Sequence, residues 1–453
     1  MNRPPGSARP LKSRPWLVTL TGLGIFILYA ATTARDRVVN DVLSASLAAW
    51  RIGTTGQPWF DDFPLDEIPT GPDQQLWTGV AGNGHVAVFR SPGAIAVGVP
   101  GYVLRRQGGT DPSDFSLLPG ALTAALLATV TLFLLWLVLR LHMSDGVAAL
   151  MVLTLGLTTP MWTVNANSLW THSLTVIGIA GMSWATTRER WWLVGVFGGL
   201  ALWGRLHMAL VVAILGLGLA LWRRRPRIAL EVGITSVSFM VLAAAWSRWM
   251  YGEWSPQGPY PSGPAYAGAA ADKSLTDHLV NQLGLWVSPD RGILVWTPLL
   301  LVLAPAVFRS WRSLPDWTRV LALAGVAYTL VQGFLNLFPG GSGFYGYRLT
   351  LELLVCLFPA FAIAATRMRS WEWWVATPVI GVQLGAISFG AFAEGYFLRD
   401  DQSWTDNSLA LALRTFPIPV VTWLALCLAL VLLAARIVGQ HARARHVPET
   451  ADA

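Results

Sequence analysis

Residues 16–41 read WLVTLTGLGIFILYAATTARDRVVND, an apolar stretch that ends at Ala34 and runs directly into charged residues. A helix needs about 20 apolar residues to cross the hydrocarbon core of a bilayer. The segment is long, lacks a small-residue cleavage site and is followed by many similar segments. These features indicate a retained membrane helix and argue against a signal peptide. Asp36 and Asp41 are therefore predicted to lie at the mouth of a membrane protein.

The composition extends this prediction to the whole chain. The chain has 453 residues, of which 54% are hydrophobic and only 13% are charged, which excludes an ordinary soluble domain. About twelve apolar segments are long enough to span a bilayer, and they begin near Pro15, Leu117, Gly146, Ser168, Trp191, His207, Ile228, Gly292, Trp317, Thr350, Trp371 and Pro417. We predict an all-α polytopic membrane protein that forms one transmembrane domain over residues 1–453, with no separate C-terminal soluble domain.

Arginine residues mark one side of the predicted membrane. They cluster at alternate ends of the apolar segments, for example at Arg140 and in residues 223–227, whereas most carboxylates fall at the opposite ends. The positive-inside rule then places both termini in the cytoplasm and the acidic segments outside the plasma membrane. The formal charge of +7 reflects this topology. The basic runs are too short and too scattered to indicate nucleic-acid binding.

Three outer regions are more than simple connections: residues 36–115, residues 251–291, and the shorter pair of segments 338–348 and 394–415. Long loops are usually functional or disordered. The first combines acidic and aromatic residues with an apolar stretch, residues 94–104, that Pro100 interrupts. We predict that it folds into short helices on the membrane surface.

Asp41 is the first candidate for catalysis. Residues 40–50 have the spacing of an amphipathic helix, which would hold this carboxylate on a rigid element near the bilayer, where it could act as a general base. The alternative is that Asp41 only caps the helix, since Asn and Asp are good N-caps. Asp36 is the competing base, but the charges of Arg35 and Arg37 would make it a weaker one.

A glycine-rich segment is the second candidate. Residues 338–348 read FPGGSGFYGYR and lead into a helix that contains Glu352. Glycine lets backbone amides approach a ligand closely, and Arg348 at a helix start adds a fixed guanidinium group, so the segment suits a phosphate. The alternative is a flexible turn with an arginine that extends toward the membrane surface.

Other polar residues fall on the same predicted side. Arg205 and His207 interrupt an apolar run, which makes them functional candidates and places them between two helices joined by a tight turn. His172 and Arg291 lie near the outer starts of further segments, although a lone histidine in a helix more often only packs. The adjacent acids Asp61 and Asp62 could bind a divalent cation or could simply be solvated. No motif for zinc, nucleotide phosphate or a dinucleotide is present.

Three motifs carry a resemblance to a known family. They are NDVLSASL at residues 40–47, SPDRGI at residues 288–293 and GGSGFYGYR at residues 340–348. In order and placement they resemble motifs of bacterial members of the GT-C superfamily, integral-membrane glycosyltransferases that use polyprenyl-phosphate sugars. The last motif has one additional residue between Phe344 and Gly346, and Leu206 stands where a proline often follows the intramembrane arginine. Several relatives carry a large C-terminal extracytoplasmic domain, which we do not expect in this chain.

The resemblance implies an inverting transfer of a sugar, with mannose or arabinofuranose favoured, from a polyprenyl-phosphate donor to a cell-envelope glycan, lipid or protein acceptor. It implies that Asp41, or else Asp36, is the general base. The donor phosphate would be bound by Arg348, Arg205, Arg291 and His172. The substrate would be contacted by Tyr345, Tyr347, His85 and Glu352.

Cofactors and other activities stay open from the sequence. No cofactor is certain, and a divalent cation remains possible. Expected partners are the lipid-linked donor, the acceptor and the bilayer, without nucleic acid. The alternatives are a transporter or flippase for a lipid-linked or anionic substrate, which would use the same arginines without needing a base, and a polymerase or ligase of polyprenyl-linked polysaccharide.

Overall fold

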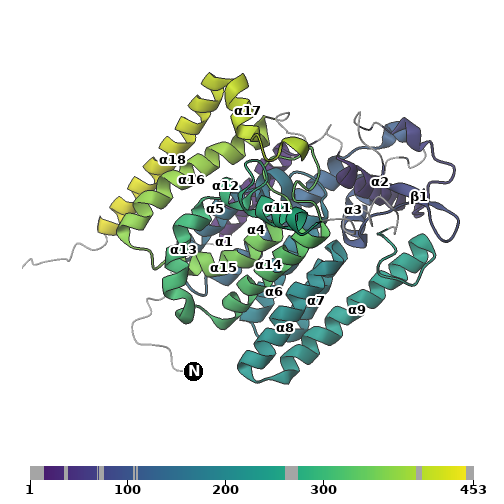
Figure 1. Cartoon of the computed structure of the whole chain (residues 1–453), viewed down its shortest axis with the longest axis horizontal. Coiled ribbons are helices and arrows are strands. Elements are labelled where there is room, and N and C mark those ends of the chain that lie inside the picture. Colours follow the sequence, from purple (N-terminus) through teal and green to yellow (C-terminus); the bar gives the residue numbers. More distant parts are fainter. Residues whose placement is uncertain are drawn as a thin grey trace, which may run out of the picture.

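A computed structural model describes residues 15–34, 39–68, 70, 76–105, 108, 111–260, 274–393 and 400–444. The described chain is mostly helical (Figure 1). The helices that match the predicted membrane segments are α1 (Pro15–Ala31), α4 (Leu118–Leu139), α5 (Asp145–Thr158), α6 (Thr171–Thr187), α7 (Trp191–Gly204), α8 (Ala209–Arg223), α9 (Pro226–Tyr251), α13 (Leu299–Ser310), α14 (Asp316–Leu335), α15 (Leu351–Ala365), α16 (Ser370–Phe392) and α18 (Pro417–Ala444).

Shorter elements connect them. The shorter α-helices are α2 (Asn40–Thr55), α3 (Pro92–Arg105), α11 (Leu275–Val287), α12 (Ile293–Trp296) and α17 (Ser408–Thr415). Single turns of other helix types are η1 (Leu65–Glu67), η2 (Pro112–Asp114), η3 (Met161–Asn165), η4 (Leu206–Met208), η5 (Trp311–Ser313) and η6 (Asp400–Gln402). The strands β1 (Thr78–Val80) and β2 (Val86–Val88) pair antiparallel.

Each predicted segment corresponds to a helix. Among the described residues, six helices are long and apolar enough to cross a membrane by length and composition alone: α4, α8 together with the preceding turn η4 (Leu206–Arg223), α9, α14, α16 and α18. Four more, α1, α5, α7 and α15, are apolar but shorter. The largest departure is near Gly292, where the short helix α12 comes before α13. The structure therefore supports a helical membrane protein, and the number of twelve spans stays a prediction.

Small residues allow the long helices to pack closely. A Cβ added at Gly199 in α7 would lie 2.2 Å from the ring of Phe239 in α9, and one added at Gly178 in α6 would lie 2.7 Å from Ala201. Membrane helices associate through such small-residue contacts, because burial in lipid offers no hydrophobic driving force between helices. The bundle of α6, α7 and α9 thus depends on glycine at its contact points.

The first outer segment folds against one side of the bundle, where Figure 1 shows α2, α3 and β1 gathered together. The predicted surface helices are present as α2 and α3. Contrary to the prediction, Pro100 does not interrupt α3, which continues through this residue. A Cβ added at Gly93 would lie 2.7 Å from the carbonyl oxygen of Trp203, so the start of α3 presses on the end of α7. This contact fixes the segment just before α3 beside the bundle.

The β-hairpin was not predicted from the sequence. Its strands are joined by residues 81–85, in which Gly84 has φ of 84° and Asn83 comes directly before it. Asn-Gly is the strongest short hairpin signal, because both positions tolerate positive φ. The prediction of an all-α fold is therefore wrong for residues 78–88, which form this small sheet.

The second outer segment ends in α11. Ser274 and Asp277 form a capping box at the start of this helix. Residues 261–273 of this segment lie outside the described residues. The Asn281 side chain donates to the carbonyl of Asn336 and accepts from the Phe338 N–H, both at 2.5 Å. These bonds fasten α11 to the start of the glycine-rich segment.

Candidate active site at one end of the helical bundle

The structure brings Asp41 and Arg348 together, although 307 residues separate them in the sequence. Arg348 Nη1 donates to Asp41 Oδ2 at 2.5 Å. Asp41 lies in the first turn of α2, whose N-cap residue is Val39, and no side chain caps this helix. The reading of Asp41 as an N-cap is therefore wrong. Its carboxylate instead meets a distant part of the chain.

Helix α2 holds this carboxylate in a fixed position. Its other face is fully buried, with Leu43, Leu47 and Trp50 at most 1% exposed. Ser44 Oγ accepts a hydrogen bond from the Trp77 backbone N–H at 3.0 Å. Burial of several apolar side chains makes rotation of the helix about its axis costly. Both ends of the helix are partly exposed, and at its start the Asp41 side chain is 22% exposed.

The glycine-rich segment folds as a tight turn that delivers Arg348. Four glycines within residues 340–346 have positive φ, between 69° and 92°, a conformation that glycine adopts without steric cost. A Cβ added at Gly343 would lie 2.7 Å from Cγ2 of Val39. The turn therefore passes against the start of α2, which explains how Arg348 reaches a residue so far away in the sequence.

Arg90 is a member of the site that sequence reasoning missed. It lies between β2 and α3, and its Nη2 contacts the Oδ1 of Asp41. Its side chain is 11% exposed, as is that of Arg348. Nothing in the sequence singles it out, because residues 36–115 also contain Arg37, Arg51, Arg105 and Arg106. The carboxylate of Asp41 thus lies between two guanidinium groups.

Aromatic rings support both guanidinium groups. The Arg348 guanidinium lies 4.7 Å from the ring centroid of Trp170, and that of Arg90 lies 5.1 Å from the ring centroid of Trp77. Arginine stacks favourably on aromatic faces. Its N–H groups lie in the plane of the guanidinium group, so they stay available to other partners when it stacks on a ring. Both arginines are therefore held in place by contacts that do not involve Asp41.

A second, buried layer contains three further predicted residues. His172 Nδ1 lies 2.8 Å from Glu352 Oε1, and Arg205 Nη2 lies 2.9 Å from His172 Nε2. Since arginine can only donate, His172 accepts at Nε2 and donates from Nδ1 to Glu352. His172 and Glu352 are fully buried, whereas the Arg205 side chain is 11% exposed. Of the three, only Arg205 is open toward a ligand.

Residues 205–208 form the predicted tight turn between two helices. Helix α7 ends at Gly204 and α8 begins at Ala209, with η4 between them. Arg205 Nε donates to Thr171 Oγ1 at 3.2 Å, and His207 stacks on Tyr328 with centroids 5.1 Å apart. The turn therefore directs Arg205 toward the start of α6, next to His172.

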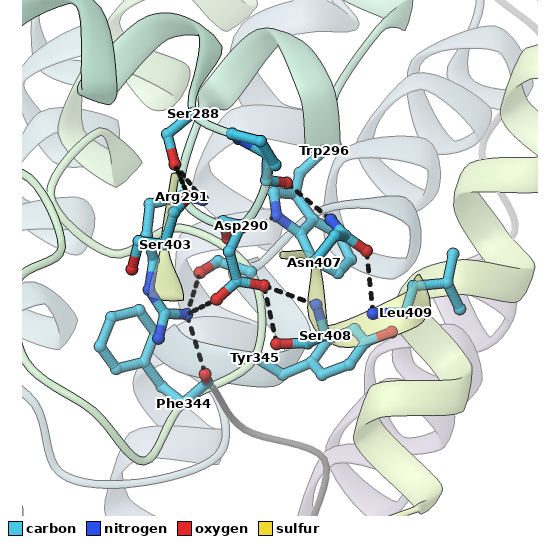
Figure 2. Close-up of polar contacts among 12 residues, drawn as sticks. Ser288, Asp290, Arg291, Trp296, Phe344, Tyr345, Ser403, Asn407, Ser408 and Leu409 are labelled. Atoms are coloured by element: carbon cyan, nitrogen blue, oxygen red, sulfur yellow. Dashed lines mark hydrogen bonds and ion pairs between the residues drawn. The ribbon is translucent and has the colours of Figure 1, made fainter. Parts of the chain in front are cut away.

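Arg291 belongs to a different cluster, which Figure 2 shows. Its Nη1 donates to the carbonyl oxygens of Phe344 at 3.1 Å and Gly346 at 2.9 Å, and pairs with Asp290 at 3.2 Å. Ser408 donates to Asp290 Oδ1 through its N–H and its hydroxyl group, both at 2.7 Å (Figure 2). Arg291 is 1% exposed. Contrary to the expectation that it binds phosphate, it faces backbone carbonyls and ties the glycine-rich turn to α17.

The two predicted tyrosines are buried in the same turn. The Tyr347 hydroxyl group lies 2.8 Å from Thr297 Oγ1, so this side chain packs inside the protein. The Tyr345 carbonyl accepts from Thr163 Oγ1 at 2.7 Å, and its ring lies 4.8 Å from that of Trp296, which donates to the Asp290 carbonyl. This placement gives Tyr347 a structural position, whereas Tyr345 also lines a hollow beside the site.

That hollow lies next to the start of α2. Segments far apart in the sequence line it, including Trp170, whose ring supports Arg348, and Val39, two residues before Asp41. The full lining is Ala34, Val39, Thr163, Asn167, Ser168, Trp170, Gly343, Phe344, Tyr345 and Gly390. Asp41, Arg348 and Arg90 are not among its lining residues, so this hollow lies beside their contact and does not contain it.

The remaining predicted residues lie apart from this pair. His85 is half exposed in the hairpin, where its Nδ1 lies 2.7 Å from Asp61 Oδ2 and its ring stacks on Trp59. The Val86 N–H and His85 hold the pKa of Asp61 below its usual value. Asp36 lies outside the described residues. Within the part of the chain that the structure describes, no group of three or more His, Cys, Asp or Glu side chains is placed to hold a metal ion.

Comparison with known proteins gives the following. The chain is similar to the oligosaccharyltransferase of Archaeoglobus fulgidus in its apo form, with a TM-score of 0.44 and 10% identity over 90% of this chain and 59% of that one. It is also similar to AglB from Archaeoglobus fulgidus in complex with an inhibitory peptide and a dolichol-phosphate, with a TM-score of 0.42 and 10% identity over 91% of this chain and 56% of that one. The chain thus spans less than two thirds of either protein. No family model and no curated sequence matches it.

Proposed function

We propose that this chain is a membrane glycosyltransferase that moves a sugar from a polyprenyl-phosphate donor to an acceptor hydroxyl group. The observation that carries the proposal is the meeting of Asp41 with Arg348 and Arg90 at one end of the bundle. A partly exposed carboxylate in contact with two guanidinium groups supplies a proton acceptor and an anion site side by side. Mannose and arabinofuranose are the donor sugars to test first.

The reaction is a single displacement at the anomeric carbon. The acceptor oxygen attacks that carbon while its proton passes to the Asp41 carboxylate, and the bond from carbon to phosphate oxygen breaks. The phosphate keeps the bonding electrons and leaves as polyprenyl phosphate. One displacement inverts the anomeric configuration. A phosphate leaving group is already stable, so no general acid is needed.

The arginines stabilise the leaving group. Negative charge grows on the phosphate as the bond breaks, and charge-assisted hydrogen bonds from guanidinium groups strengthen with it. Arg348 and Arg90 are the groups that would touch the phosphate, with Arg205 at the edge of the site. His172 and Glu352 act through Arg205 as positioning residues, because both are fully buried. Arg291 positions the turn that carries Arg348.

The site end of the bundle is proposed to face the outside of the plasma membrane, with both termini in the cytoplasm. Arginines such as Arg140 and Arg223 lie at the opposite ends of their helices. An outward site would meet lipid-linked donors and cell-envelope glycan, lipid or protein acceptors. A divalent cation remains an optional component.

Turnover with a defined donor tests the proposal. The purified chain in lipid nanodiscs, given a polyprenyl-phosphate sugar and cell-envelope glycan, should release polyprenyl phosphate. Asp41→Asn should lower this release by about 100-fold or more, as expected for loss of a general base, while donor binding is retained. Asp406→Asn is the matched control, because it also removes one carboxylate from an Asp–Arg pair, with Arg414 at 2.9 Å, away from the site.

The outcomes separate the activities. Unchanged release by the Asp41→Asn variant would remove Asp41 from the mechanism and leave Asp36 as the acid to test. Movement of the intact lipid-linked substrate across the bilayer, without bond cleavage, would instead indicate a transporter or flippase. Transfer of a whole glycan in one step would indicate a polymerase or ligase.

A further inference from the structure

The carboxylate of Asp41 occupies the space between two guanidinium groups and uses a different oxygen for each. Its Oδ2 accepts from Arg348 Nη1 at 2.5 Å, and its Oδ1 contacts Arg90 Nη2. This bridging arrangement is also how a phosphate with two free oxygens binds to a pair of arginines. The carboxylate therefore lies where the anionic group of a ligand would be bound most strongly.

This arrangement conflicts with the use of Asp41 as a base in the same position. A carboxylate held by two positive charges is a poor proton acceptor, because each charge favours the ionised form. The conflict disappears if the carboxylate leaves the arginines before the proton is transferred. A ligand that binds the same two guanidinium groups would release it.

The geometry allows such an exchange. One carboxylate contacts both guanidinium groups, so an anion of similar size can contact the same two groups in its place. Both are anchored by rings, that of Trp170 for Arg348 and that of Trp77 for Arg90. The anion site therefore keeps its shape when Asp41 leaves, and the 22% exposure of Asp41 leaves room for a new position.

We propose that Asp41 is a placeholder for the phosphate of the lipid-linked substrate. The phosphate displaces the Asp41 carboxylate from Arg90 and Arg348, and only then is this carboxylate available to accept the proton of the acceptor. The inference rests on the proposed transferase function and deepens it. It predicts ordered binding, with donor before acceptor, and no active base in the absence of donor.

The buried pair of Asp290 and Arg291 shows what a permanent ion pair looks like in this chain. Asp290 is fully buried and is also held by two hydrogen bonds from Ser408. The Asp41 carboxylate, in contrast, is 22% exposed, and its contacts with Arg348 and Arg90 are the ones that a competing anion would replace.

Binding of geranyl monophosphate tests the proposal without any sugar transfer. The probe carries the phosphate and a short isoprenoid tail, and its affinity for the full chain in nanodiscs is measured by calorimetry. If Asp41 competes with phosphate, Asp41→Asn should bind the probe at least about tenfold more tightly than the unmodified chain. Arg90→Gln should bind it at least about tenfold more weakly. Neutral geraniol separates the contribution of the tail.

The control measures the general effect of removing a negative charge. Asp406→Asn should leave the affinity unchanged within about twofold, and unfolding midpoints verify that all variants are folded. If Asp41→Asn binds geranyl monophosphate no more tightly than the Asp406→Asn control, the placeholder proposal is overturned. Unchanged affinity of Arg90→Gln for this probe would overturn it as well. These results are independent of turnover. A chain that transfers no sugar from any donor contradicts the transferase proposal even when the binding pattern is the one expected.

Discussion

Two aspartate–arginine contacts on the same side of the molecule have opposite surroundings. Asp290 and Arg291 are at most 1% exposed, and hydrogen bonds from Ser408 and to two backbone carbonyls accompany their ion pair. Asp41 is 22% exposed and meets two arginines. The first cluster is closed to solvent, whereas the second is partly open. We infer that the buried pair builds the turn and the open cluster binds an anion.

The comparison matters because both regions carry a family-like motif. A sequence motif gives the residue type and the order, but it does not give the partners. Breaking a buried ion pair leaves an uncompensated charge and destabilises the structure, whereas positive groups at a partly open surface attract an anionic ligand. The predictions below separate these two roles, from the largest expected effect to the smallest.

Replacement of the buried arginine should give the largest effect. Arg291→Leu removes the partner of a fully buried carboxylate, and breaking a buried pair in this way costs about 3–5 kcal/mol. We expect a lower thermal unfolding midpoint in detergent and loss of activity together. The double variant Asp290→Asn with Arg291→Leu should recover part of the stability. A midpoint of Arg291→Leu equal to that of the unmodified chain would contradict the structural role of this pair.

Replacement of the open arginine should affect turnover and leave stability nearly unchanged. Arg348→Gln removes a group that stabilises the charged leaving group, and loss of one such donor lowers turnover by about 100- to 1,000-fold. The unfolding midpoint should stay close to that of the unmodified chain, because Arg348 is partly exposed. The measurement is release of polyprenyl phosphate beside a thermal melt. If Arg348→Gln unfolds as readily as Arg291→Leu, the two regions do not differ in role.

The glycine-rich turn links the two regions and should respond to small changes. Gly346→Ala would place a side chain where φ is 91° and where the added Cβ lies 2.8 Å from Pro160. We expect it to lower the free energy of unfolding by about 1–3 kcal/mol. Gly341→Ala is the matched control, since φ is 92° there but nothing lies within 4 Å of the added Cβ. It should cost less, as measured by thermal unfolding. If both variants lose the same stability, the positive φ alone accounts for the effect and the contact with Pro160 adds nothing.

The exposed Asp61–His85 pair should have the smallest effect, visible only as a dependence on pH. Hydrogen bonds from the Val86 N–H and from His85 hold the pKa of Asp61 below its ordinary value of 3.8 in the folded chain. A lowered folded pKa stabilises the folded state above the unfolded pKa, and this contribution is lost as the pH falls through the folded pKa. Unfolding midpoints between pH 5 and pH 2 should therefore fall less steeply in Asp61→Asn. If the midpoints of Asp61→Asn and of the unmodified chain fall in parallel with pH, the Asp61–His85 pair does not contribute to stability.

Much of the helical fold was predictable from the sequence. Apolar segments about 20 residues long and the arginines between them locate the helices, because only a helix satisfies its own backbone in lipid. The hairpin before Arg90 was missed, although Asn83-Gly84 signalled it. Its strands are short and lie between surface helices, so the alternation of apolar and polar residues was too brief to detect.

The site was predictable in part. The motifs led to Asp41 and Arg348, and the structure places them in contact. Arg90 was missed because a single arginine outside any motif carries no spacing signal. The buried position of Arg291 was also missed, since burial depends on Ser408 and on a turn more than 50 residues away, which no local pattern encodes.

The 307-residue separation of Asp41 and Arg348 has a consequence for biosynthesis. A ribosome that adds about 5–20 residues per second produces Arg348 roughly 15–60 s after Asp41. During this interval the growing chain already contains Arg90 and α2, so the acid can meet its first partner long before its second. Anion recognition by both arginines is therefore acquired only late in synthesis, and a chain whose translation stops before Arg348 lacks one of the two guanidinium groups.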